Sequence, residues 1–169
     1  MIKRINEQTN NISLLAVNHS NALFGEALHS TPEQVGKNLT LKVSEAIKEA
    51  AEIPFAEAYF ICLNQEIIGY TAVVFDETIP EPDKRNWLWQ FMIDQNYQGK
   101  GYASQALALV IEHMFQKAKE KVITLSTKPD NEPALLLYKK FGFIETGEKN
   151  GDEIILQKYC DANESNDYS

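Results

Sequence analysis

The sequence has few cysteines, no long apolar run and a deficit of basic residues, and each absence excludes a class of protein. Its two cysteines, Cys62 and Cys160, lie far apart and have no partners at the spacing of a metal site or a disulfide framework. An apolar run such as residues 106–111 is far shorter than the roughly 20 residues of a membrane-spanning helix. Residues 1–7 contain no apolar stretch typical of a signal peptide. We therefore expect a reduced, cytoplasmic protein without a metal.

Basic residues are outnumbered, with 16 Lys and Arg against 24 Asp and Glu, and the formal net charge is −8. Proteins that bind nucleic acids or anionic membranes need clustered Lys and Arg. We therefore expect neither nucleic acid nor membrane as a partner. An acidic surface favours cationic partners, although it also serves simply to keep a protein soluble.

What the chain does have is the composition of one globular domain. Its 169 residues are 44% hydrophobic and 24% charged, which excludes a disordered or collagen-like chain. We expect residues 1–160 to form the domain and residues 161–169 to form a loose, polar and acidic tail. The sequence does not decide between a monomer and a homodimer.

Apolar periodicity predicts an alternation of helices and strands, which indicates a mixed α/β domain with a partly antiparallel sheet. Strands are expected at residues 1–6, 56–63, 66–75, 85–93 and 122–126, and on either side of the hairpin signal at 150–151. Helices are expected at 12–20, from Thr31 to Pro54, at 102–118, and from Pro133 to a left-handed stop at Gly142.

The most informative segment is a strand, a short loop with Gly99 and Gly101, and an amphipathic helix. Small residues before a helix N-terminus let backbone N–H groups approach a phosphate, and Lys100 adds a positive charge. A plain strand-to-helix turn explains two glycines equally well. The segment is neither a Walker loop nor the full dinucleotide fingerprint.

Two blocks of residues resemble the GNAT family of N-acetyltransferases. Residues 98–103, Gln-Gly-Lys-Gly-Tyr-Ala, match that family's Gln/Arg-x-x-Gly-x-Gly/Ala loop. A second block follows in order at residues 131–143, Asn-x-x-Ala-x-x-x-Tyr-x-x-x-Gly-Phe. The resemblance, strong over residues 87–145, implies a central, mostly antiparallel mixed sheet flanked by helices in a single α/β domain. It also implies an acetyl-CoA-dependent N-acetyltransferase.

The resemblance further implies which residues bind acetyl-CoA, with no metal. Backbone groups of Phe91, Met92 and Ile93 would hold the pantetheine arm. The loop and first helical turn would hold the pyrophosphate; these residues are Gln98, Gly99, Lys100, Gly101, Tyr102, Ala103 and Ser104. Asn131 would hydrogen-bond the arm, and Lys140 would reach the cofactor phosphates.

Tyr138 is the expected catalytic residue, because the resemblance places its hydroxyl at the thioester sulfur. A departing thiolate needs a proton or a hydrogen bond, and a phenol provides either. The alternative is a core aromatic, since Tyr138 lies at helical spacing with Leu137 and Phe141.

No general base is identified by the sequence. Relatives often use an acid on the central strand, but alternation predicts two faces without one: Trp87, Trp89, Phe91 and Ile93 on one, and Leu88, Gln90 and Met92 on the other. The remaining candidates, each more typical of a solvated surface, are Asp76, Glu77, Glu81, Asp83, Glu26 and Glu33. The three histidines, His19, His29 and His113, are predicted to be surface residues.

The strand and loop look similar to bacterial spermine/spermidine acetyltransferases, which implies a cationic polyamine as the small-molecule acceptor. Trp89 and Gln90 depart from the charged pair expected there. An aminoglycoside or protein amine, and a non-catalytic CoA-binding sensor, remain as alternatives. The sequence predicts direct attack in a ternary complex, because no cysteine lies where a covalent intermediate would form.

Overall fold

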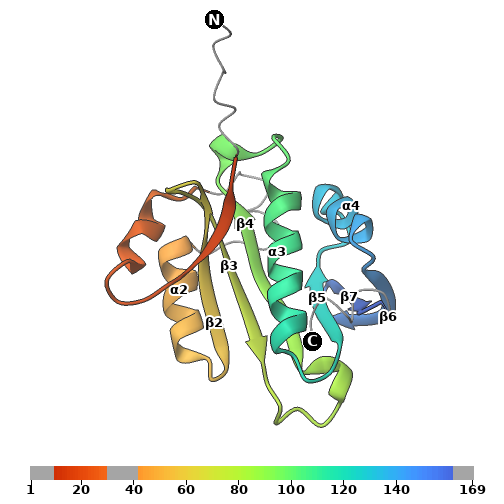
Figure 1. Cartoon of the computed structure of the whole chain (residues 1–169). Helices are drawn as coiled ribbons and strands as arrows, with labels where there is room; N and C mark the ends of the chain where they lie inside the picture. The colour runs from red at the N-terminus through yellow and green to blue at the C-terminus, as the bar shows by residue number, and fades with distance from the viewer. Residues whose placement is uncertain (1–9, 30–41, 162–169) are drawn as a thin grey trace, which may run out of the picture.

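The computed structural model describes residues 10–29 and 42–161, which form a seven-stranded sheet with the order β1-β2-β3-β4-β5-β7-β6 (Figure 1). Neighbouring strands are antiparallel except for β4 and β5, which are parallel. The strands are β1 Ile12–Ala16, β2 Ala56–Leu63, β3 Glu66–Phe75, β4 Asn86–Ile93, β5 Val122–Thr127, β6 Ile144–Asn150 and β7 Glu153–Tyr159. The mixed, mostly antiparallel sheet expected from the sequence is confirmed.

Three α-helices and three short 3₁₀ helices connect the described strands. The α-helices are α2 Val43–Glu52, α3 Tyr102–Lys117 and α4 Glu132–Lys140. The 3₁₀ helices are η1 Ala22–Ala27, η2 Pro82–Lys84 and η3 Gln95–Tyr97. None of the helices within residues 10–29 and 42–161 is long and apolar enough to cross a membrane.

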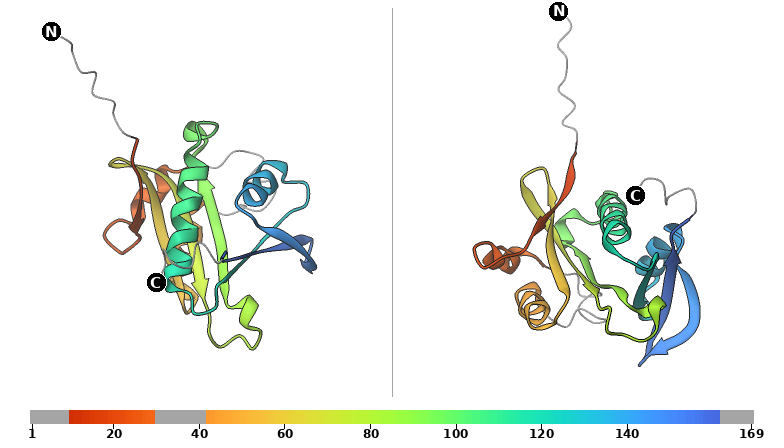
Figure 2. Two further views of the ribbon diagram at one scale, coloured as in Figure 1. Left: turned by 45° about the vertical axis from the view of Figure 1, so that its right-hand side comes forward. Right: turned by 60° about the horizontal axis from the view of Figure 1, so that its bottom comes forward.

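Helices cover both faces of the sheet, with η1 and α2 on one face and α3 on the other (Figure 2). On the α3 face, the buried side chains of Leu107, Met114 and Phe115 pack against the strands. On the α2 face, Ile47 packs with the fully buried Tyr70. Burial of these apolar faces is the main force that holds the layers together.

The helix expected at residues 12–20 is wrong, because residues 12–16 form the edge strand β1 and a 3₁₀ helix follows at 22–27. Ile12 pairs with Leu63 and Ala16 with Tyr59, so β2 supplies the hydrogen-bond partners. An isolated helix of this length is marginal, whereas pairing with an existing sheet adds bonds and burial together. The strand expected at 1–6, the start of the helix at 31 and the tail after 161 lie outside the described residues.

The hairpin signal at residues 150–151 and the helix stop at Gly142 are confirmed, and a third residue with left-handed backbone angles lies between β2 and β3. Asn64 has a φ of 56° in the tight turn between β2 and β3, and Gly151 has a φ of 61° between β6 and β7. Gly142 has a φ of 87° just after α4, where a left-handed residue was expected. Cys62 is buried, with 6% of its surface exposed.

Candidate active site

The loop between β4 and α3 has the backbone conformation that its two glycines allow. Gly99 has a φ of 74° and Gly101, the N-cap of α3, has a φ of 82°, both in the left-handed region. A Cβ atom built on either glycine would meet nothing within 4 Å. The glycines are therefore not required by packing inside the protein, and open space lies directly above the loop backbone.

The start of α3 presents unpaired N–H groups to that space. The first bond between the N-cap and the helix is donated by the Gln105 N–H to the Gly101 carbonyl at 3.3 Å. The N–H groups of Tyr102, Ala103 and Ser104 precede it, so the helix geometry gives them no intrahelical partner. Together with the helix dipole, they make this end of α3 attractive to an anion.

Lys140 joins the end of α4 to the start of α3. Its Nζ lies 3.3 Å from the Ser104 hydroxyl oxygen, although the two residues are distant in sequence. Figure 1 shows α4 beside the N-terminal half of α3. The arrangement adds a positive charge to the anion-attracting end of the helix. Lys100, by contrast, lies over the Tyr97 ring at 5.8 Å.

Two side chains that follow β4 hold the loop in place. The Gln98 amide donates a hydrogen bond to the Ile93 carbonyl at 2.9 Å. The buried Asp94 carboxylate accepts from the N–H of Asn96 at 2.9 Å and from the N–H of His29 at 2.8 Å. Asp94 was not among the residues expected to bind the cofactor; an Asp side chain that accepts from the backbone N–H two residues on is a common turn device. Gln98 was expected to bind the cofactor, and its side-chain amide supports the backbone of the loop.

The strands β4 and β5 separate toward the loop end of the sheet. They share one register pair among the described residues, Trp87 with Thr124. Beyond it the two halves of the sheet open away from each other, as Figure 2 shows. One edge of β4 remains paired with β3 as far as Ile93. Backbone groups on the other edge, around Phe91 and Met92, therefore face the separation and not a neighbouring strand.

On the β5 side of the separation, α4 positions Asn131 and Tyr138. Asn131 is the N-cap of α4, but its side chain makes no capping hydrogen bond. The half-buried Tyr138 packs edge-to-face on Phe143, with ring centroids 5.8 Å apart. Burial and the nearby Glu153 carboxylate raise the pKa of Tyr138 to about 12. The phenol is therefore protonated at neutral pH and available as a hydrogen-bond donor or acid.

The two faces predicted for β4 are wrong because the strand contains a bulge. Ala72 pairs with Gln90 and Val73 with Leu88, so Trp89 is an extra residue. Such a bulge reverses the alternation of side chains. Leu88 consequently packs on the α3 face together with Phe91, while Trp89 packs with the core on the α2 face.

The carboxylates considered as bases lie away from this region. Asp76, Glu77, Glu81 and Asp83 lie in the loop that precedes β4, at the opposite end of the strand from the glycine loop. Asp76 accepts hydrogen bonds from the N–H and hydroxyl of Thr78. Glu26 is exposed on η1, and Glu33 lies outside the described residues.

His113 is not a free surface residue as predicted, because it forms a polar cluster between α3 and β2. Its Nε2 lies 3.1 Å from a Glu57 carboxylate oxygen and 3.2 Å from the Tyr59 hydroxyl, which itself donates to Glu57 at 2.8 Å. Lys117 pairs with the same carboxylate. Burial lowers the pKa of His113 despite the neighbouring Glu57, which Lys117 and Tyr59 already satisfy.

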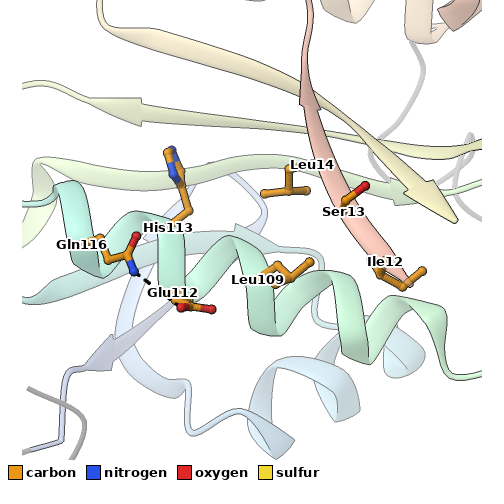
Figure 3. Close-up of a pocket in the computed structure, with 7 residues that line it drawn as sticks. All are labelled: Ile12, Ser13, Leu14, Leu109, Glu112, His113 and Gln116. Carbon is orange, nitrogen blue, oxygen red and sulfur yellow. Dashed lines mark hydrogen bonds between the residues drawn. The ribbon is translucent and has the colours of Figure 1, made fainter. Parts of the chain in front are cut away.

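Two hollows among the described residues lie away from the glycine loop. One of about 300 Å³ lies between β1 and α3, where Leu14, Leu109 and His113 line it (Figure 3). A second, of about 610 Å³, lies at the other end of α3, near Phe55 and Lys119. Across residues 10–29 and 42–161, no cluster of three His, Cys, Asp or Glu side chains is suited to a metal ion.

The glycine loop, α3 and α4 all fall within the part of the chain that matches a known family. A model described as the acetyltransferase (GNAT) family matches residues 25–143. The chain belongs to the GNAT acetyltransferase family. It is therefore an acyltransferase, and the fold expected from the resemblance is confirmed.

Several relatives of this GNAT enzyme are named polyamine acetyltransferases. The spermine/spermidine N(1)-acetyltransferase of Bacillus subtilis (strain 168) is 29% identical over 151 residues, which span 87% of this chain and 98% of that protein. The spermidine N(1)-acetyltransferase of Escherichia coli (strain K12) is 32% identical over 74 residues, 44% of this chain and 40% of that protein.

Solved GNAT structures share the fold of this chain at low sequence identity. The spermidine N-acetyltransferase from Vibrio cholerae in complex with CoA and spermine has a TM-score of 0.65 and 18% identity, covering 88% of this chain and 94% of that one. The acetyltransferase from Thermus thermophilus has a TM-score of 0.70 and 19% identity, covering 89% of this chain and 97% of that one.

Proposed function

We propose that this GNAT enzyme transfers the acetyl group of acetyl-CoA to a primary amine of a polyamine such as spermidine or spermine. The similarity to the Bacillus subtilis enzyme carries the proposal, because it spans nearly the full length of both chains. The formal charge of −8 supports a cationic acceptor, since a negative field concentrates polycations near the protein.

The loop end of the sheet fits acetyl-CoA. The open space above Gly99 and Gly101 and the first-turn N–H groups of α3 fit a pyrophosphate. Lys140 would add an ion pair to the phosphates. The unpaired edge of β4 fits the amide groups of the pantetheine arm, which backbone groups of residues 91–93 would hold. The side-chain amide of Asn131, which makes no capping hydrogen bond, would reach the same arm.

When bound, acetyl-CoA supplies an activated acyl thioester. In the proposed reaction the amine nitrogen forms a bond to the acetyl carbon, the carbon–sulfur bond breaks, and the amine loses one proton to water. Tyr138 donates its proton to the departing sulfur and recovers one from solvent. Its raised pKa keeps this acid protonated throughout the neutral range. Attack is direct, because Cys62 is buried on β2 and Cys160 follows β7.

The release of CoA in the presence of a panel of amines tests the proposal. The panel consists of spermidine, spermine, an aminoglycoside and a peptide with a free N-terminus. We expect turnover with the two polyamines and weaker turnover with the others. Faster turnover of the aminoglycoside or the peptide would contradict a polyamine acceptor and would identify that amine class as the substrate. Tight acetyl-CoA binding without turnover of any amine would favour a CoA-binding sensor.

The role of Tyr138 has a separate test in Tyr138→Phe. This variant should lower kcat about 100-fold or more while the dissociation constant of CoA stays unchanged. Tyr159→Phe is the matched control, because Tyr159 is 61% exposed at the end of β7 and should leave kcat unaltered. An unchanged kcat in Tyr138→Phe would remove the acid from the mechanism.

A further inference from the structure

Two buried side-chain oxygens of the described chain have no hydrogen-bond partner: Tyr70 Oη and Gln90 Oε1. Tyr70 is fully buried, with 0% of its surface exposed. A buried oxygen that has lost its water without gaining a donor is costly, so most native proteins avoid it. Neither residue has a part in the cofactor site described above.

The two oxygens belong to neighbouring residues on one face of the sheet. Tyr70 pairs with Met92 and Ala72 pairs with Gln90, so Tyr70 and Gln90 are diagonal neighbours across β3 and β4. Their side chains therefore share the α2 face, where Tyr70 and Met92 belong to one buried cluster. Gln90 lies beside the bulge at Trp89, close to where β4 leaves β5.

The chemistry of this pair suits a ligand that offers N–H donors. A glutamine carbonyl oxygen and a phenol oxygen both accept hydrogen bonds. Burial and the Glu49 carboxylate on α2 raise the pKa of Tyr70, so the phenol stays neutral at pH 7 and its oxygen remains a neutral acceptor. Tyr138 packs with the core of the opposite face, so a nucleophile held by Tyr70 and Gln90 and a leaving group at Tyr138 would lie on opposite sides of β4.

We propose that Gln90 Oε1 and Tyr70 Oη accept hydrogen bonds from the reacting amino group of the acceptor and position its nitrogen. This inference rests on the proposed function, because it assigns the acceptor end of the same reaction. It also accounts for the missing base. Neutral oxygen acceptors in an apolar site do not stabilise the ammonium form as a carboxylate would, so the amine is bound with its lone pair free.

Two nearly isosteric variants test the pair: Tyr70→Phe and Gln90→Met. Each should raise KM for spermidine about tenfold, the effect of one lost hydrogen bond, while KM for acetyl-CoA stays unchanged. In the presence of CoA, the rise in melting temperature caused by spermidine should shrink in both variants. Without ligand, neither variant should melt below the wild type, because each removes an unpartnered oxygen.

Tyr59→Phe is the matched control, since the Tyr59 hydroxyl bonds Glu57 and His113 on the α3 side. It should lower the melting temperature and leave KM for spermidine unaltered. Wild-type turnover with an unchanged spermidine KM in both test variants would overturn this inference alone. A wild type that turns over no amine would overturn the proposed function and this inference together. An equal rise of KM in Tyr59→Phe would show a general effect of destabilisation and would also overturn it.

Discussion

Gly101→Ala separates the two reasons for which a glycine occurs at the start of α3. The residue has a φ of 82°, which costs an alanine roughly 1–2 kcal/mol in the left-handed region. No steric cost is added, because a Cβ at this position meets nothing within 4 Å. For a chain of this size, the strain predicts a loss of roughly 2–8 °C in melting temperature.

The same Cβ would occupy the space where we place the pyrophosphate. We therefore expect the dissociation constant of CoA, measured by isothermal titration calorimetry, to rise about tenfold or more, because even one displaced charge-assisted hydrogen bond has that effect. KM for the amine should stay close to its wild-type value, since the acceptor does not contact the loop in this proposal.

Gly151→Ala is the internal control for backbone strain. Gly151 has a φ of 61° in the hairpin between β6 and β7, and its Cβ would likewise meet nothing within 4 Å. It should lose a similar amount of stability and bind CoA normally. Equal loss of stability in both variants, with CoA affinity unchanged in both, would refute the placement of the pyrophosphate over the loop.

Two further predictions concern charged groups around the sheet. Lys140→Ala should raise KM for acetyl-CoA severalfold, and added salt should reduce the difference from wild type because the charge is exposed; a difference that salt does not alter would contradict phosphate contact. His113 has a pKa lowered by burial, so the unfolded state binds its proton more readily and the stability of the wild type should fall as pH drops below about 6.5. Urea unfolding at pH 5.5 and 7.5 measures this effect, and His113→Gln should remove this part of the pH dependence. If the free energy of unfolding of the wild type instead rises relative to that of the variant on acidification, pairing with Glu57 dominates.

The sequence predicts the elements whose signals are local. Residues 56–63 and 66–75 alternate or run apolar between clear turns, and both strands form as expected. The helix at 102–117 buries the face defined by Leu107, Val110 and Met114. At residues 12–16 the decisive interaction is not local, because pairing with β2 turns a weakly patterned segment into an edge strand. No periodicity within the segment itself reports that partner.

The candidate site is predictable where backbone conformation decides it. Gly99 and Gly101 have the left-handed angles that the loop pattern requires, and Lys140 comes to the start of α3. The environment of His113 is different, because its partners Glu57 and Tyr59 come from a strand far away in sequence. A histidine beside Glu112 on a helix looks like a surface residue until the opposing strand is known.

The bulge in β4 shows why a base could not be sought by alternation alone. A regular strand would put Trp87, Trp89 and Phe91 on one face, whereas the extra residue sends Trp89 to the α2 face and leaves Phe91 on the α3 face. The residues predicted to share one face of β4 therefore lie on both faces of the sheet, and that set cannot be used to look for a carboxylate base beside the thioester. Once the bulge is taken into account, the polar group on the α2 face of β4 is Gln90. Its side chain is neutral and lies beside Trp89 and Met92 in apolar surroundings. Such surroundings lower the pKa of a bound amine instead of removing its proton with a base, so in the proposed reaction the strand contributes by selecting the neutral nucleophile.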